Sequence, residues 1–256
     1  MQFIDTHCHL DAAEFGDTQA LLINEAMSAG VGAIVIPSVD ASNFATVQKI
    51  CAQHANCAPA FGIHPMYVDR AKRSDLDLLR EFIQQHHPVA VGEIGLDFFV
   101  ENFDREHQEY YFSAQLKLAQ AFDLPVLLHI RKAQDTILKH LRRTPVRGGI
   151  AHAFNGSPQQ AAEFIKLGFK LGFGGAMTYP RATRLRELAA TLPLDSIVLE
   201  TDSPDIPPAF LRRGEPNRPG FLPRIAGTLA ELRHLPLEEI ARITSANAVA
   251  ALPGLK

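Results

Sequence analysis

VAVGEIGLD, residues 89–97, is one of eight short apolar runs on which the fold of this 256-residue chain depends. The runs are mostly continuous rather than alternating with polar residues, which is typical of strands covered on both faces. Helix-like segments separate them along the whole chain. In chain order the runs are QFIDTH (2–7), AIVIPSV (33–39), APAFGIH (58–64), VAVGEIGLD (89–97), PVLLHIR (125–131), GGIAHAF (148–154), FKLGFGG (169–175) and SIVLETD (196–202).

The segments between the runs carry apolar residues at helical spacing, most clearly over residues 17–29, 104–121 and 159–167. Ser157 followed by Pro158 predicts a helix start, because serine caps the first turn and proline fits its first position. Ser74, which is followed by two nearby aspartates, predicts another start. Gly30 and Gly168 predict helix ends.

Strands and helices alternate eight times along the chain, and this pattern predicts an α/β protein with the fold of a (β/α)8 TIM barrel. We expect the barrel to occupy residues 1–256 as one domain. Residues 203–223 are rich in proline and lack periodicity, so we expect a long loop over the barrel mouth. Residues 237–250 predict one extra C-terminal helix. The alternative is a doubly wound open sheet, but the glycine-rich phosphate loop usual in that fold is missing.

Composition narrows the class of protein. The net charge of −3 argues against a protein whose whole surface binds nucleic acid, although a local basic groove stays possible. Three cysteines in a chain of this length do not indicate a disulfide framework. The first residues do not predict a signal peptide, and no apolar run reaches the length expected of a membrane span. We expect a cytoplasmic protein without membrane association, and nothing indicates an obligate protein partner.

Histidines and isolated acids recur at the carboxyl ends of the apolar runs. A parallel barrel brings those ends to one face, so side chains from distant parts of the sequence meet there. Imidazole and carboxylate groups gathered in this way predict a site for two divalent metal ions, with zinc, manganese and nickel favoured by the ligand types. The six predicted ligands are His7, His9, Glu93, His129, His152 and Asp202.

Some of these residues point to a metal only in combination. Residues i and i+2 of a strand share a face, so His7 and His9 can reach one ion while Cys8 points away. Glu93 lies within an apolar run, where it either binds a cation or pairs with a partner such as Arg131. Taken singly, His129 or His152 is more readily interpreted as a buried core histidine, but two histidines at equivalent strand ends favour ligation.

Three further residues have two interpretations each. Asp202 can ligate a metal and accept a proton from water, or cap the following turn. Asp5 can orient one of the histidines or cap a turn. His64 can contact substrate or shape the turn before Pro65. Gly172, Gly174 and Gly175 in FKLGFGG can make room for a ligand or form a turn.

These motifs resemble the TatD family of metal-dependent hydrolases, within the wider amidohydrolase-like barrels. The similarity lies in FIDTHCHLD (3–11), AFGIHP (60–65), VGEIGLDF (91–98), LPVLLHIR (124–131), HAFNGS (152–157), GFGGAMTYPRA (172–182), LETDSPDIPP (199–208) and TSANAVA (244–250). The resemblance implies that His7, His9 and Asp202 hold one metal, that His129 and His152 hold the other, that Glu93 joins both, and that His64 lies near the substrate phosphate.

The family includes metal-dependent deoxyribonucleases, some of them exonucleases, and its nucleases are associated with magnesium. The loop RRGEPNRPGFLP (212–223) departs from the family pattern but supplies Arg218, which we expect to hold phosphate oxygens. The resemblance therefore implies hydrolysis of DNA phosphodiesters. The alternatives are a small phosphoester substrate, a carboxyl ester or amide substrate, for which related barrels often carry a lysine in place of Glu93, and a non-catalytic binding protein.

Overall fold

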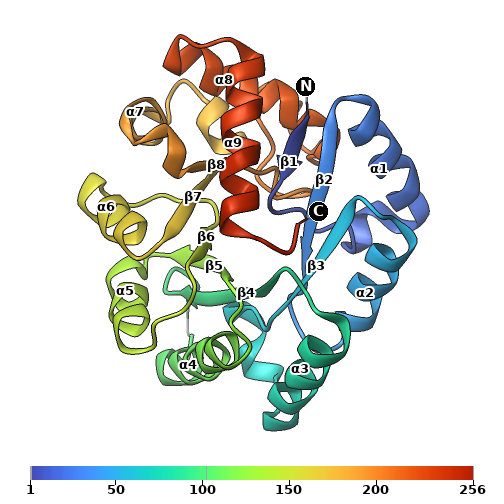
Figure 1. Ribbon diagram of the computed structural model, residues 1–256, viewed down its shortest axis with the longest axis vertical. Coiled ribbons are helices and arrows are strands. Elements are labelled where there is room, and N and C mark those ends of the chain that lie inside the picture. The colour runs from blue at the N-terminus through green and yellow to red at the C-terminus, as the bar shows by residue number, and fades with distance from the viewer. Residues whose placement is uncertain (1, 102, 256) are drawn as a thin grey trace.

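The computed structural model describes residues 2–101 and 103–255. Eight parallel strands pair in chain order, β1 with β2 and onward to β8, and helices surround them (Figure 1). The predicted (β/α)8 barrel is therefore confirmed, and the open doubly wound sheet is excluded by the sequential strand order. The strands are β1 (Phe3–Asp5), β2 (Val31–Pro37), β3 (Cys57–Phe61), β4 (Ala90–Asp97), β5 (Val126–Arg131), β6 (Gly149–Ala151), β7 (Phe169–Phe173) and β8 (Ile197–Leu199).

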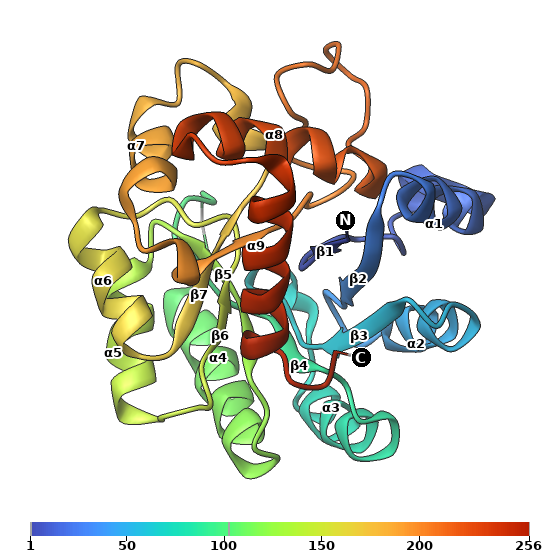
Figure 2. The same ribbon diagram turned by 45° about the horizontal axis from the view of Figure 1, so that its top comes forward.

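The helices follow the strands as the periodicity predicts. They are α1 (Gln19–Ser28), α2 (Phe44–Gln53), α3 (Arg73–His86), α4 (Arg105–Ala121), α5 (Gln134–Arg143), α6 (Pro158–Lys166), α7 (Thr183–Thr191), α8 (Leu222–Arg233) and α9 (Leu237–Ala251). Short 3-10 turns are η1 (Ala13–Thr18), η2 (Pro65–Arg70), η3 (Gly175–Thr178), η4 (Leu194–Ser196) and η5 (Pro219–Phe221). The loop between β8 and α8 projects beyond the neighbouring helices in Figure 2, where it is orange.

Helix starts follow local capping chemistry. The Ser157 hydroxyl accepts a hydrogen bond from the Gln160 backbone N–H, and the Gln160 side-chain oxygen accepts one from the Ser157 backbone N–H, so the predicted start of α6 is confirmed. The start predicted at Ser74 was wrong by two residues. Lys72 stands at the cap of α3 because the Asp75 carboxylate accepts from its backbone N–H at 2.8 Å.

The extra C-terminal helix is confirmed as α9, which crosses the end of the barrel opposite the strands' carboxyl ends (Figure 1). Its apolar residues pack with interior side chains of the strands, including Val35, Leu127 and Val198. A larger apolar layer lies between the strands and the outer helices. Since α9 closes one end, only the other end is left for a binding site. No helix among the described residues is long and apolar enough to cross a bilayer.

The barrel closes between β8 and β1 through the residues that follow these two short strands. Three backbone hydrogen bonds join the two segments. The N–H of Thr6 donates to the carbonyl of Leu199 at 3.1 Å, that of Asp202 to the carbonyl of His7 at 2.8 Å, and that of His9 to the carbonyl of Ser203 at 2.8 Å. We call residues 6–9 and 199–203 the seam. The runs 2–7 and 196–202 therefore yield strands of only three residues, because their carboxyl ends form the seam instead of the regular ladder. The run 148–154 also yields a strand of three residues.

Asp5 stabilises the seam with its side chain rather than orienting an imidazole. Its carboxylate is fully buried and accepts from the Thr201 backbone at 2.9 Å and the Thr201 hydroxyl at 2.6 Å. It also accepts from the His7 backbone at 3.3 Å. Burial raises the pKa of Asp5 to about 7 despite these donors.

Replacing Thr201 by valine should weaken the seam. The change leaves Asp5 and Ser203 without a buried hydroxyl partner, so we expect the free energy of unfolding to fall by about 1–3 kcal/mol. Urea denaturation of the metal-free protein measures this. Thr244→Val is the matched control, because that hydroxyl bonds a carbonyl of its own helix. Equal losses in the two variants would show that the Asp5–Thr201 contact contributes nothing specific.

Candidate metal centre

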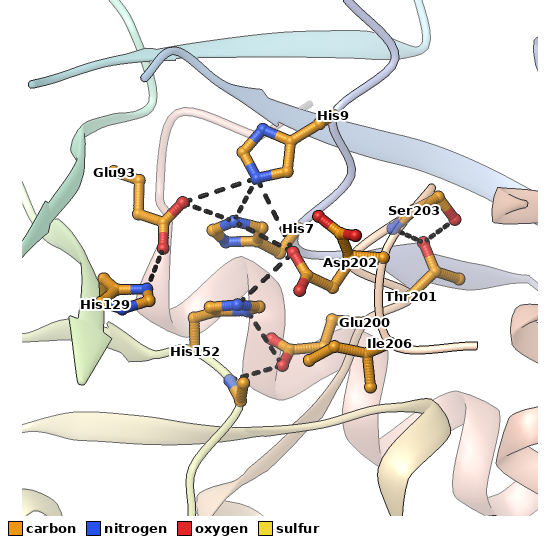
Figure 3. Close-up of polar contacts among 12 residues, drawn as sticks. His7, His9, Glu93, His129, His152, Glu200, Thr201, Asp202, Ser203 and Ile206 are labelled. Atoms are coloured by element: carbon orange, nitrogen blue, oxygen red, sulfur yellow. Dashed lines mark hydrogen bonds and ion pairs between the residues drawn. The ribbon is translucent and has the colours of Figure 1, made fainter. Parts of the chain in front are cut away.

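A cavity of about 870 Å³ opens at the carboxyl ends of the strands, opposite α9. All six predicted ligands except His7 line it, and His7 lies fully buried directly against them. Figure 3 shows the cluster: His7 and His9 come from the end of β1, Glu93 from β4, His129 from β5, and His152 and Asp202 from the segments after β6 and β8. The topology thus brings together the groups that the sequence disperses.

Four donor atoms converge at the centre of this cluster. His7 Nε2 lies 3.3 Å from His9 Nε2, 3.1 Å from Glu93 Oε2 and 3.8 Å from Asp202 Oδ1. His9 Nε2 lies 3.5 Å from the same Glu93 oxygen and 3.7 Å from the same Asp202 oxygen. Ligands about 2.0–2.1 Å from a tetrahedral zinc ion are separated by roughly 3.3–3.4 Å, so this spacing fits a metal site.

The second carboxylate oxygen of Glu93 lies beside another imidazole, that of His129. His129 Nδ1 lies 3.0 Å from Glu93 Oε1, while His129 Nε2 lies 3.0 Å from the fully buried Asp97. Asp97 thereby fixes which ring nitrogen of His129 faces Glu93. Arg131 does not pair with Glu93, which corrects that alternative. Its guanidinium lies instead over the Phe99 ring.

His152 stacks on His7, with the two ring centroids 3.7 Å apart (Figure 3). Its Nε2 lies 3.5 Å from Asp202 Oδ1, and its Nδ1 lies 3.0 Å from Glu200 Oε1, although not in hydrogen-bond alignment. Glu200 is held in turn by the Ala153 backbone N–H at 2.6 Å. The pair resembles the carboxylate–histidine arrangement that orients metal ligands.

His64 differs from the other imidazoles in its hydrogen bonds. The Met66 backbone N–H donates to His64 Nδ1 at 3.2 Å, so this nitrogen carries a lone pair. The proton of the neutral ring must then be on Nε2, which lies 3.6 Å from Glu93 Oε1. Burial, and next the charge of His129, lower the pKa of His64 to about 3. His64 thus presents an N–H donor to the cavity.

The acids of the centre are ionised. Burial alone would raise the pKa of Glu93, but the charges of His7 and His64 and the hydrogen bonds of His129 and His7 hold it well below its usual value. For Asp202 the opposing causes are again burial, which raises the pKa, and the charge and hydrogen bond of His152, which lower it. Ionised carboxylates beside imidazoles are the donors that a divalent cation requires.

The donor set fits a divalent metal ion. His7, His9 and Asp202 form one group of three donor atoms within 4.8 Å of one another, and His7, Glu93 and His152 form another. A third such group joins His129 with Glu93 and His64 rather than with His152. The described residues therefore bring all six predicted ligands to one cluster, while the division into two metal sites stays a prediction.

Arg218 is not brought to this cavity. Its guanidinium lies 3.6 Å from the Glu25 carboxylate on α1, and it does not line the cavity wall. The glycines in and after β7 make room for other parts of the protein, and Gly172 and Gly174 also line the cavity. A Cβ on Gly172 would collide with the Glu200 carboxylate, and one on Gly175 would collide with the backbone of Ile206.

The sequence interpretation did not single out two functional acids, Asp97 and Glu200. Each lies in an apolar run, at the same strand end as a predicted ligand. Asp97 follows Glu93 by four residues and Glu200 precedes Asp202 by two, which places each pair on one face of an extended chain. This even spacing from a predicted ligand is the feature of the sequence from which the two acids could have been predicted.

The barrel, the cavity and the set of donor atoms are those of a metal-dependent hydrolase. The family model described as "TatD related DNase" matches residues 4–253, so the chain belongs to the TatD family. It is 42% identical to the uncharacterized metal-dependent hydrolase YjjV of Escherichia coli K12, with 94% of each chain covered. The crystal structure of YjjV, described as a TatD homolog, superposes with a TM-score of 0.94 at 41% identity and 98% coverage of both chains.

A second relative carries a named activity. The chain is 31% identical to the protein named 3′-5′ ssDNA/RNA exonuclease TatD of Erwinia amylovora, over 95% of this chain and 97% of that protein. This protein is accordingly a metal-dependent hydrolase of the TatD family. Its substrate is a separate question, because YjjV itself is uncharacterized.

Replacing Asp97 by asparagine tests the positioning of His129. The amide can present its NH₂ group to the ring, so we expect metal affinity to fall roughly 10- to 100-fold while the fold is retained. Competition with a chromogenic chelator measures the affinity. Asp75→Asn, which changes an exposed helix cap, is the control. Unchanged affinity in Asp97→Asn would remove Asp97 from metal binding.

Proposed function

We propose that this protein hydrolyses phosphodiester bonds of DNA, acting as an exonuclease on strand ends. The observation that carries the proposal is the convergence of His7, His9, Glu93 and Asp202 at the floor of a cavity large enough for a nucleotide. The Erwinia exonuclease supports the choice of a phosphodiester. We expect His7, His9 and Asp202 to hold one ion, His129 and His152 a second, and Glu93 to reach both.

A bound divalent ion of this kind acts as a Lewis acid toward a phosphoryl oxygen and makes water a stronger acid. The chain itself supplies the proton acceptor. Asp202 is ionised and has its Oδ1 beside three imidazoles, so we propose that its carboxylate orients the attacking water and takes its proton. Glu93, Asp97 and Glu200 keep the imidazoles in place while this occurs.

We assign His64 the role of a donor to the substrate rather than a metal ligand. Its Nε2–H faces the cavity, and the Met66 N–H fixes that tautomer. A neutral donor beside a phosphoryl oxygen stabilises the charge that develops during attack. Because burial holds its pKa near 3, this imidazole stays neutral at physiological pH.

A small phosphoester is the second candidate substrate. Arg131 is the only lysine or arginine among the described residues that line the cavity. A protein that followed a long DNA backbone would usually use more cations. Binding of such a small molecule would show little dependence on salt, whereas extended DNA contacts would give a steep dependence.

The substrate proposal is tested with a 5′-labelled single-stranded oligonucleotide and Mg²⁺ or Mn²⁺. We expect stepwise shortening that EDTA stops and that Glu93→Ala abolishes, because Glu93 contacts donors on both sides of the centre. Asp202→Asn should lose kcat with the fold intact. Turnover of a generic phosphodiester without oligonucleotide cleavage would favour the small phosphoester. If metal-loaded protein hydrolyses neither, the phosphodiester proposal is wrong, and carboxyl esters and amides come next.

The role of His64 has its own test. Replacing it by alanine should lower kcat/KM roughly 10²- to 10³-fold, the usual effect of removing one donor to a developing charge. Metal content should not change, in contrast to His9→Ala, because a protonated Nε2 is not a ligand. Metal analysis of both purified variants checks this. Metal loss in His64→Ala equal to that in His9→Ala would make His64 a ligand.

A further inference from the structure

The mouth of the cavity is electrostatically uneven. Beyond the central cluster, the acids along one edge are Asp11, Glu14 and Asp205, which follow β1 and β8. The cation on the cavity wall is Arg131, at the end of β5. A polyanionic strand that leaves the centre is repelled at the first edge and attracted at the second. The β5 edge is therefore the favoured path for the rest of a substrate chain.

An exposed aromatic ring lies at this edge. Phe99, in the loop after β4, is about half exposed, and the Arg131 guanidinium lies 3.8 Å from its ring centroid. The Lys132 ammonium lies 4.6 Å from the same centroid. In the ion pairs of the described residues, neither cation has a carboxylate partner. The ring positions two cations without neutralising their charge.

The same loop is tied to the metal centre. The Phe99 backbone N–H donates to Asp97 Oδ1 at 2.9 Å, and the other oxygen of Asp97 holds His129 at 3.0 Å. The backbone of Phe98 donates to the Arg131 carbonyl at 2.9 Å. The backbone of Phe99 is thus linked through one carboxylate to the predicted ligand His129, and its loop is fixed to the end of β5. A group held by this loop is therefore on the His129 side of the centre.

We infer that Phe99, Arg131 and Lys132 form a subsite for the nucleotide adjacent to the hydrolysed bond. The two cations take its phosphate, and the phenyl ring that they lie against takes its unpaired base. A base in a duplex is already stacked and paired, so the subsite selects single-stranded nucleic acid. This inference rests on the proposed function, because it supposes a polynucleotide substrate.

The test measures binding of a short 5′-fluorescein oligothymidylate with hydrolysis-resistant phosphorothioate linkages to the metal-loaded protein by anisotropy, over a series of salt concentrations. Arg131→Ala and Lys132→Ala should each flatten the slope of log affinity against log salt by about 0.7, the contribution of one phosphate contact on a single strand. Phe99→Ala should weaken binding roughly fivefold or more through lost stacking. Phe99→Leu, which keeps apolar bulk, should show the same loss.

An abasic oligomer of equal length isolates the role of the base. On that ligand Phe99→Ala should lose much less affinity than on the thymidylate, since no base remains to stack and only the positioning of the two cations is lost. Lys139→Ala on α5 and Tyr110→Ala on α4 are matched controls, because Lys139 is an exposed cation and Tyr110 an exposed ring with Arg73 at 5.6 Å. Both controls should match the wild type with either ligand.

The outcomes separate the subsite from the proposed function. If metal-loaded wild type cleaves the oligonucleotide but the Phe99, Arg131 and Lys132 variants bind like the controls, the subsite is wrong and the function stands. Equal losses of Phe99→Ala on the thymidylate and the abasic oligomer would overturn base stacking. If the wild type neither binds nor cleaves the oligonucleotide, both the function and the subsite are wrong.

Discussion

Closure of the barrel between β8 and β1 is the constraint on which the rest of the structure depends. The seam is made by backbone hydrogen bonds of residues 6–9 and 199–203 and by the buried contact of Asp5 with Thr201. His7, His9 and Asp202 lie within these same residues. The hydrogen bonds that close the sheet therefore also set the distances among three donor atoms, so the fold and the centre share one set of interactions.

The centre places ionised groups where water is largely excluded. Such burial is unfavourable unless every charge has a close partner. Glu93 meets this requirement with imidazoles on both oxygens, while Asp97 and Glu200 reach the outer sides of His129 and His152. Three atoms of the centre stay incomplete, since His7 Nδ1, His152 Nδ1 and Glu200 Oε2 are buried without a hydrogen-bond partner. A cluster built in this way serves metal binding at a cost to stability.

Substrate selection, by contrast, depends on the loops above the strands. The family motifs are shared along the chain, but the arginine that the sequence favoured, Arg218, is paired with Glu25 outside the cavity. Arg131 instead lines the wall, beside an exposed ring. Side chains of loops point into solvent rather than into a shared core. The partners of Arg218 and Arg131 are therefore decided by the course of the backbone in each loop.

The sequence alone determined the barrel, the extra helix and the six predicted ligands, because continuous apolar runs define buried strands and a parallel barrel brings their carboxyl ends together. Only the tertiary structure decided the partners of those ligands. Asp97 and Glu200 contact imidazoles that lie 32 and 48 positions away in the sequence, and the tautomer of His64 depends on the direction of a neighbouring backbone N–H. Apolar periodicity encodes neither. The position of a strand can be found from the order of residues along the chain. The pairing of side chains, in contrast, depends on the register of the strands and on the closure of the folded barrel.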